Sequence, residues 1–256
     1  MQISETINKH LCITHVKMDC DHQLADNLCP PLDSFLNGFC WAIIGASGTG
    51  KTNYLCSLIQ KGQDKKLKLR KGFKNIFNQI FIVSPSLKTI KNNPFDDITD
   101  DWKHSELTLE TLEAFEDLCL SSIEEAEQND ETKPFHCLIL DDCGTIIRKN
   151  KEIEHKLNKI IANRRHNLSC SIIMLLQSTK QIPPSFRSNL SHLTCFHPKT
   201  FAEKESMYEW IDSKKQDAHL LFDYAFKKPH DTFFIDLTGR SGKYKYYRNF
   251  NELIIK

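Results

Sequence analysis

Hydrophobic residues along this chain fall into short uninterrupted runs separated by longer polar or amphipathic stretches. The apolar runs lie at residues 39–44, 79–84, 136–140, 171–176 and 193–196. Runs of this length, bounded by turn-forming residues, are typical of strands that are covered on both faces. The pattern therefore predicts five buried strands that belong to a largely parallel sheet.

The segments between these runs show helical spacing of their apolar positions. We expect helices at residues 51–61, 109–128, 151–163, 201–211 and 214–226, and a short element that begins at Pro183-Pro184. Strands that alternate with helices indicate an α/β fold with a mostly parallel central sheet flanked by helices. Two β-rich pieces at residues 232–237 and 244–250 flank a Gly-containing turn, which predicts a C-terminal β-hairpin.

The length of 256 residues suits one large domain with a small appendage. Residues 1–36 show weak periodicity and contain the Pro30-Pro31 break, so we predict an N-terminal extension there. Residues 37–256 are predicted to form one domain. The first 21 residues are polar, and no apolar run reaches the length of a membrane span. Ten scattered cysteines include no CxxC pair. We expect an intracellular protein with free thiols that is neither secreted nor membrane-embedded.

Charge is distributed unevenly, although the formal net charge is only +1. Residues 61–74 are strongly basic, whereas acidic residues dominate from 96 to 131. A basic stretch of this kind either follows a phosphate backbone or forms a solvated loop, and the sequence leaves both interpretations open.

The string GASGTGKT follows the first apolar run and precedes a predicted helix. In that context, glycines let the backbone curl so that its N–H groups face phosphate oxygens, and the helix N-terminus adds partial positive charge. Lys51 would reach the β- and γ-phosphates, and the Thr52 hydroxyl would hold Mg²⁺. The predicted nucleotide-binding residues are Gly45, Ala46, Ser47, Gly48, Thr49, Gly50, Lys51, Thr52 and Asn53.

A pair of carboxylates follows the third apolar run. Asp141 and Asp142 come directly after four apolar residues, where a strand would carry them to the edge of the sheet that faces the phosphate loop. We predict that Asp141 binds Mg²⁺ and that Asp142 polarises the attacking water. Because successive strand residues point in opposite directions, both roles require the strand to end at this pair. The simpler alternative is a pair of Asp residues that caps the strand.

Four further polar residues are candidates for catalysis. Gln177 ends the fourth apolar run, where an amide could sense the γ-phosphate or position water. Arg164, Arg165 and Arg187 are candidates for a cation that stabilises transition-state charge, including from a neighbouring subunit, and we rank the first two ahead of Arg187. Surface or DNA-contact roles are equally consistent with each arginine.

The sequence also indicates whether the nucleotide is GTP or ATP. Asp141-Asp142-Cys143-Gly144 also fits the DxxG string of switch GTPases, which additionally need an NKxD motif for guanine. The nearest string, Asn158-Lys159-Ile160-Ile161, lacks the Asp, so ATP is favoured.

Together these motifs resemble the poxvirus-type genome-packaging ATPases of the FtsK/HerA superfamily. The resemblance rests on GASGTGKT, LILDD, NRRHN, SIIMLLQS and PPSFRSN, and covers roughly residues 36–200. It implies a RecA-like P-loop NTPase fold and an ATP-driven motor that moves double-stranded DNA into a preformed capsid. It also implies that Lys51 and Thr52 bind the nucleotide, that Asp141 binds the metal, and that Asp142 is the catalytic acid.

The resemblance further implies a homo-oligomeric ring, capsid or portal-vertex partners, and a location in the cytoplasm or viral factory of an infected cell or in the virion. In such a ring, the basic segment from Lys65 to Lys74 is a candidate DNA-facing loop. Two alternatives remain: a nucleotide-gated interaction protein, which DNA would not stimulate, and a P-loop kinase, which needs an arginine-bearing lid that is not evident in the sequence.

Overall fold

The computed structural model describes residues 32, 35–59, 73, 76–87, 95, 98–211, 215–239 and 244–254. Most of the predicted N-terminal extension therefore lies outside the described residues. The same holds for the basic segment from Lys65 to Lys74, apart from Phe73.

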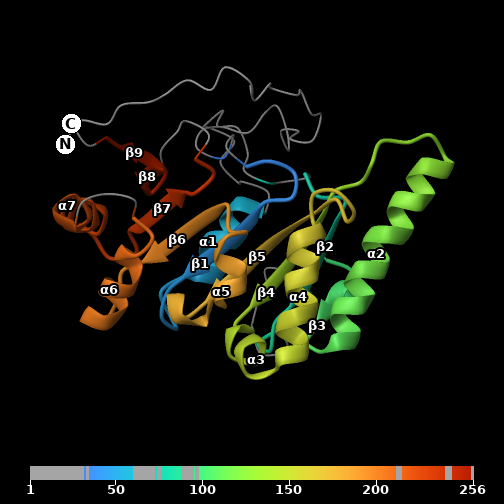
Figure 1. Ribbon diagram of the computed structural model, residues 1–256, viewed down its shortest axis with the longest axis horizontal. Helices are drawn as coiled ribbons and strands as arrows, with labels where there is room; N and C mark the ends of the chain where they lie inside the picture. Colours follow the sequence, from blue (N-terminus) through green and yellow to red (C-terminus); the bar gives the residue numbers. More distant parts are fainter. Residues whose placement is uncertain are drawn as a thin grey trace, which may run out of the picture.

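One twisted nine-stranded sheet forms the centre of the described part of the chain (Figure 1). Its spatial order is β3-β2-β4-β5-β1-β6-β7-β8-β9, and the strands from β3 to β6 are parallel while β7, β8 and β9 are antiparallel. The strands are β1 (Cys40–Ile44), β2 (Gln79–Val83), β3 (Lys103–His104), β4 (His136–Asp141), β5 (Cys170–Leu176), β6 (His192–Phe196), β7 (Thr232–Asp236), β8 (Lys245–Arg248) and β9 (Asn251–Leu253).

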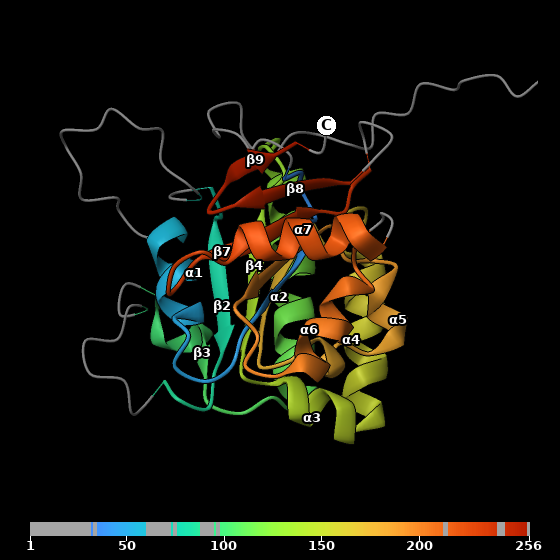
Figure 2. The same ribbon diagram turned by 90° about the vertical axis from the view of Figure 1, so that its left-hand side faces the viewer.

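Helices lie on both faces of this sheet, and Figure 2 shows α1 on one side and α2, α4, α5 and α6 on the other. The helices are α1 (Lys51–Ile59), α2 (Leu109–Gln128), α3 (Gly144–Lys149), α4 (Lys151–Asn163), α5 (Pro184–Arg187), α6 (Phe201–Tyr208) and α7 (Lys215–Ala225). Two 3₁₀ turns, η2 (Asp100–Trp102) and η3 (Thr179–Gln181), complete the described elements.

The alternation of side chains along β1 divides the core into two layers. Cys40, Ala42 and Ile44 pack into the cluster that includes α2, α4, α6 and α7, whereas Trp41 and Ile43 pack into the cluster that includes α1. All five side chains are buried, as expected for a strand in the middle of a doubly covered sheet. The apolar run thus positions the phosphate loop by burying the strand that leads into it.

Most of the elements predicted from the sequence are confirmed. The helix predicted at 109–128 has those bounds. Its start is fixed by a capping box that Thr108 forms with Thr111. The β7–β8 hairpin is antiparallel as predicted. The structure adds α3, β3 and β9, which the sequence pattern did not indicate because each is too short to show a periodicity.

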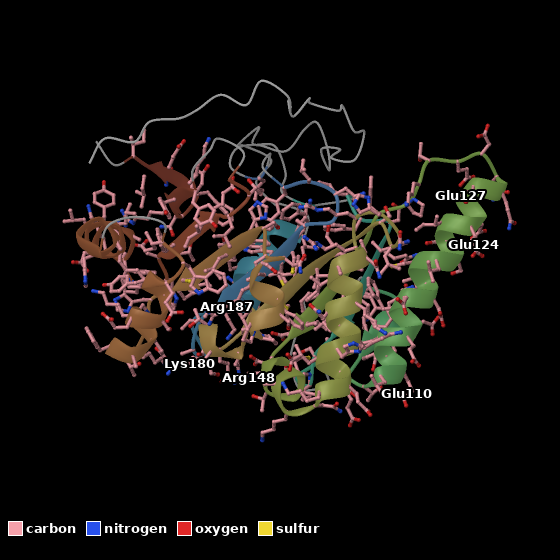
Figure 3. All side chains as sticks on the ribbon, in the orientation of Figure 1. Glu110, Glu124, Glu127, Arg148, Lys180 and Arg187 are labelled. Carbon is pink, nitrogen blue, oxygen red and sulfur yellow. The ribbon has the colours of Figure 1, made fainter. Side chains whose placement is uncertain are left out.

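Charge segregation on the surface partly follows the sequence. Figure 3 shows Glu110, Glu124 and Glu127 on α2 at the right of the view, while Arg148, Lys180 and Arg187 lie to the left of that helix. The acidic part of the chain therefore includes the exposed face of an amphipathic helix. Within the described residues, no helix has the length and apolar character needed to cross a membrane.

Leu157 and Leu120 provide a matched test of this packing. Leu157 on α4 is fully buried, whereas Leu120 on α2 is 41% exposed. We expect Leu157→Ala to lower the free energy of unfolding by about 3 kcal/mol, because it leaves a cavity under the sheet. Leu120→Ala should change it by no more than about 0.5 kcal/mol. Urea denaturation of both variants measures the difference, and equal stabilities would contradict the assigned core.

Candidate nucleotide-binding site

The phosphate loop lies between Ile44, which ends β1, and Lys51, which begins α1. Gly50 adopts a φ of 98°, a conformation that residues with a side chain rarely take. A Cβ atom on Gly45 would lie 2.5 Å from the Thr49 hydroxyl oxygen and 2.9 Å from Cβ of Phe196. These two positions therefore require glycine, and the loop has the tight curl that backbone recognition of phosphate needs.

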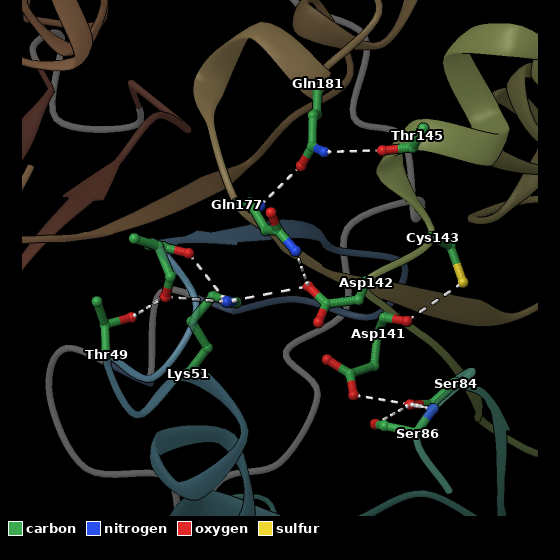
Figure 4. Close-up of polar contacts among 12 residues, drawn as sticks. Thr49, Lys51, Ser84, Ser86, Asp141, Asp142, Cys143, Thr145, Gln177 and Gln181 are labelled. Carbon is green, nitrogen blue, oxygen red and sulfur yellow. Dashed lines mark hydrogen bonds and ion pairs between the residues drawn. The ribbon is translucent and has the colours of Figure 1, made fainter. Parts of the chain in front are cut away.

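The side chain of Lys51 is 6% exposed and lies over this loop. Its Nζ donates hydrogen bonds to the carbonyl oxygens of Gly45 at 2.9 Å and Ala46 at 3.4 Å. The same Nζ lies 4.0 Å from Oδ1 of Asp142 (Figure 4). The ammonium group is thus already positioned at the mouth of the loop, between the loop and the acid pair.

Asp141 is the buried carboxylate of the pair and the last residue of β4. Its Oδ2 accepts a hydrogen bond of 2.8 Å from the hydroxyl of Ser84, which follows β2. Burial raises the pKa of Asp141, and the neighbouring Asp142 adds to this effect, while the Ser84 bond and the charge of Lys51 oppose it. A cation bound beside Asp141 would therefore stabilise its ionised form.

Asp142 has its carboxylate at the same edge of the sheet as Asp141, because its backbone is left-handed, with a φ of 53°. That turn ends the strand and removes the alternation that would otherwise send the two side chains in opposite directions. The Asp142 side chain is 39% exposed, and its Oδ1 accepts a 3.5 Å hydrogen bond from Nε2 of Gln177. The structure therefore brings Lys51, both acids and Gln177 together, as the sequence predicted.

Gln181 belongs to this cluster, although no sequence pattern singled it out. Its Oε1 accepts a 2.7 Å hydrogen bond from the backbone N–H of Gln177, and its Nε2 donates to the Thr145 hydroxyl at 3.3 Å (Figure 4). A Cβ on Gly144 would lie 2.9 Å from Cδ of Gln181, so glycine at the start of α3 makes room for it. Gln181 and Ser84 both form hydrogen bonds to residues of the site. Their role depends on these contacts, so it is visible only in the structure.

The residues at this edge fit Mg²⁺. Thr52 and Asn53 lie in the first turn of α1, and Asp141 ends β4, so a bound Mg²⁺ would find the Thr52 hydroxyl and the Asp141 carboxylate as candidate oxygen ligands. Among the described residues, no three His, Cys, Asp or Glu side chains form a group able to hold a metal. This donor set suits a Mg²⁺ ion that arrives with nucleotide phosphates and keeps part of its water shell.

The arginines occupy different positions. Arg164 is 5% exposed, and its guanidinium donates to the carbonyl oxygens of Gly38 at 2.6 Å, Asn189 at 3.0 Å, and Ile161. Gly38 precedes β1 and Asn189 precedes β6, so Arg164 lies at the amino ends of the strands, opposite the phosphate loop. The prediction that Arg164 is a catalytic finger is therefore corrected: it joins three backbone segments, and its donors are engaged inside the fold.

Arg165 and Arg187 remain candidates for a finger. Arg165 is half-buried beside Gly38, and a Cβ atom on that glycine would lie 2.5 Å from Cγ of Arg165. Arg187 on α5 is more exposed; its guanidinium bonds to Glu209 at 3.3 Å and lies 5.4 Å from the ring centroid of Trp210. Arg165 thus lies near the amino end of β1, and Arg187 contacts the end of α6. A finger role for either arginine therefore requires the site of a neighbouring subunit.

A Gly-rich loop at the carboxyl edge of a parallel sheet, an acid pair at the end of β4 and a glutamine just after the intervening β5 define the class of P-loop NTPases. Within that class, a model of the family described as the poxvirus A32 protein matches residues 33–221. The chain belongs to this family. Among curated protein sequences, no match to the chain is found.

Solved structures confirm the fold. The genome packaging NTPase B204 from Sulfolobus turreted icosahedral virus 2, in complex with sulfate, aligns with a TM-score of 0.51 and 12% identity over 85% of this chain and 98% of that one. The same NTPase in complex with AMPPCP aligns with a TM-score of 0.51 and 12% identity over 82% and 98% of the two chains. The likeness is one of architecture: a mostly parallel P-loop sheet flanked by helices.

The structural role of Arg164 can be tested by stability. Arg164→Leu leaves the buried carbonyl of Gly38 and the part-buried carbonyl of Asn189 without their donor, so we expect the free energy of unfolding to fall by about 3 kcal/mol. Arg165→Leu, at the next position and with greater exposure, is the control and should cost under about 1 kcal/mol. Chemical denaturation measures both. A stable Arg164→Leu protein would restore Arg164 as a candidate finger.

Proposed function

We propose that this protein is an ATP-driven motor that packages double-stranded DNA into a preformed viral capsid. The observation that carries the proposal is the convergence of the Lys51 ammonium, the Asp141–Asp142 pair and Gln177 at one edge of the sheet. Membership of the poxvirus A32 family supports it. So does the architectural likeness to a virus protein described as a genome packaging NTPase.

In this proposal, each site residue has a role that follows from its position. Lys51 exchanges its contacts with the Gly45 and Ala46 carbonyls for contacts with the β- and γ-phosphates. The backbone N–H groups of the loop and of the first turn of α1 bind phosphate oxygens. Thr52 and Asp141 hold Mg²⁺, which neutralises charge that develops on the phosphates.

Asp142 and Gln177 act on the attacking water. The water oxygen forms a bond to the γ-phosphorus, the bond from that phosphorus to the β–γ bridging oxygen breaks, and ADP leaves with the electron pair. The exposed carboxylate of Asp142 accepts a hydrogen bond from the water and then its proton. Gln177, whose amide already contacts Asp142, orients the same water or senses the γ-phosphate. Ser84 holds Asp141 and Gln181 holds Gln177, so the acid pair and the glutamine stay in register.

The motor is proposed to work as a ring of identical subunits. Transition-state charge at one site would then be stabilised by Arg187 or Arg165 of a neighbouring copy, and Arg187 is the better placed because its side chain is 43% exposed. Capsid or portal-vertex proteins are the proposed partners, in the cytoplasm or viral factory of an infected cell. The basic segment 65–74 remains the candidate for sequence-independent contact with DNA phosphates.

Turnover with and without duplex DNA tests this function. We expect wild-type ATP hydrolysis to increase severalfold with duplex DNA, and this stimulation to fall as salt rises. Asp142→Asn should lower turnover by about a hundredfold or more while leaving ATP binding intact. Asp130 offers a matched control, because it is also exposed and also has a positive φ, 55°, yet it lies beyond the end of α2.

Asp130→Asn should retain wild-type turnover, since Asn tolerates the left-handed conformation at both positions. Normal hydrolysis by Asp142→Asn would contradict the catalytic role of that carboxylate. ATP hydrolysis that duplex DNA does not change would instead favour a nucleotide-gated interaction protein.

A further inference from the structure

The loop between α7 and β7 lies against the phosphate loop, although the two residues that join them are 181 positions apart in the chain. Its residue His230 has Nδ1 3.3 Å from the backbone carbonyl oxygen of Thr49. Because a carbonyl oxygen only accepts hydrogen bonds, Nδ1 carries the proton in this contact. The His230 side chain is otherwise exposed, so its ring has a free surface beside the phosphate loop.

His230 has a left-handed backbone where it contacts the phosphate loop. Its φ is 65°, in a region that is uncommon for residues other than glycine, although histidine, asparagine and aspartate enter it more often than most. A residue other than glycine keeps this conformation where neighbouring groups fix it, and such residues gather at ligand-binding sites.

Asp231 anchors the loop. Its Oδ2 accepts the backbone N–H groups of Lys227 at 3.0 Å and Lys228 at 2.7 Å, and also Nη2 of Arg248 at 2.7 Å. Its Oδ1 accepts Nδ2 of Asn249 at 2.6 Å. Burial alone would raise the pKa of Asp231, but the bonds from Asn249 and Arg248 lower it to about 2. A permanently charged carboxylate therefore fixes the loop to β8, and His230 with it.

The order of the strands decides which end of a nucleotide His230 faces. The acids proposed to act on the terminal phosphate lie at the end of β4, and Gln177 follows β5, both on one side of β1. The α7–β7 loop is on the other side, because Thr232 at the start of β7 pairs with Phe196 at the end of β6. A nucleotide whose γ-phosphate lies by the acids must extend its nucleoside end across the phosphate loop toward β6 and β7.

We propose that the α7–β7 loop forms the subsite for the nucleoside end of the bound nucleotide, with the base packed on the imidazole ring of His230. The proposal rests on ATP binding at the phosphate loop, as in the proposed function. The ring offers a flat aromatic face, and its bond to Thr49 sets its orientation. An aromatic face of this kind recognises a purine base by stacking.

Calorimetric titration of the full chain with Mg-ATP and with Mg-tripolyphosphate tests this subsite, because tripolyphosphate has the phosphates and lacks the nucleoside. His230→Gly removes the ring and suits the φ of 65°, so the loop keeps its shape. We expect this variant to bind Mg-ATP about tenfold more weakly and to bind Mg-tripolyphosphate as the wild type does. His166→Ala, at an exposed histidine in the turn after α4, is the control and should bind both ligands normally.

His230→Asn separates stacking from the hydrogen bond, because its amide can still donate to Thr49 but presents no aromatic ring. It should behave like His230→Gly. The inference is overturned if His230→Gly binds Mg-ATP with wild-type affinity, if it loses affinity for both ligands equally, or if His230→Asn restores Mg-ATP binding. If the wild type binds neither Mg-ATP nor Mg-tripolyphosphate, the proposed function itself is overturned, and this inference with it.

Discussion

The ammonium group of Lys51 lies between the carbonyl oxygens of its own loop and the carboxylate of Asp142, and the rest of the site is arranged around that position. A buried cation is tolerated only when oxygen atoms surround it. Here the loop carbonyls meet this need, and phosphate oxygens can replace them. The site can form only if β1, which precedes the loop of Lys51, and β4, which precedes Asp142, end level with each other at the same edge of the sheet.

Strand register supplies that alignment. Ile44 of β1 pairs with Leu176 of β5, and Leu175 of β5 pairs with Asp141 of β4. The residues that follow these strands, Gly45, Gln177 and Asp142, therefore emerge at one edge. The register is fixed by burial on both faces, because a slip of one residue would send every side chain of the strand into the other core layer. The hydrogen bond from Trp41 to Thr194 adds a fixed point between β1 and β6.

The sequence predicts well those features that repeat or that obey a chemical rule. The apolar runs identify the parallel strands, the spacing of apolar residues identifies α2, and GASGTGKT followed by a helix identifies the phosphate loop. The acid pair and Gln177 could be predicted because parallel strands end at a common edge. Burial of a charged residue has no comparable signal, which is why Arg164 looked like a catalytic arginine although it joins backbone segments at the opposite edge.

Contacts between distant parts of the chain were also beyond the sequence. Gln181, Ser84 and His230 form hydrogen bonds with partners that lie 36, 57 and 181 residues away, and nothing in their local sequence pattern marks them. The left-handed conformation of Asp142 is a similar case, since Asp is only moderately favoured there. Sequence reasoning therefore singled out the residues that converge at the edge of the sheet, Lys51, the acid pair and Gln177, and missed those that hold them in place.

In the function proposed above, the phosphate loop and the acid pair together hold one metal–nucleotide complex. Electron paramagnetic resonance with Mn²⁺ in place of Mg²⁺ tests it most directly. We expect one bound Mn²⁺ per chain that requires ATP, with affinity about tenfold or more weaker in Asp141→Asn and in Thr52→Val. Mn²⁺ binding that is unchanged in both variants, or that does not depend on ATP, would contradict it.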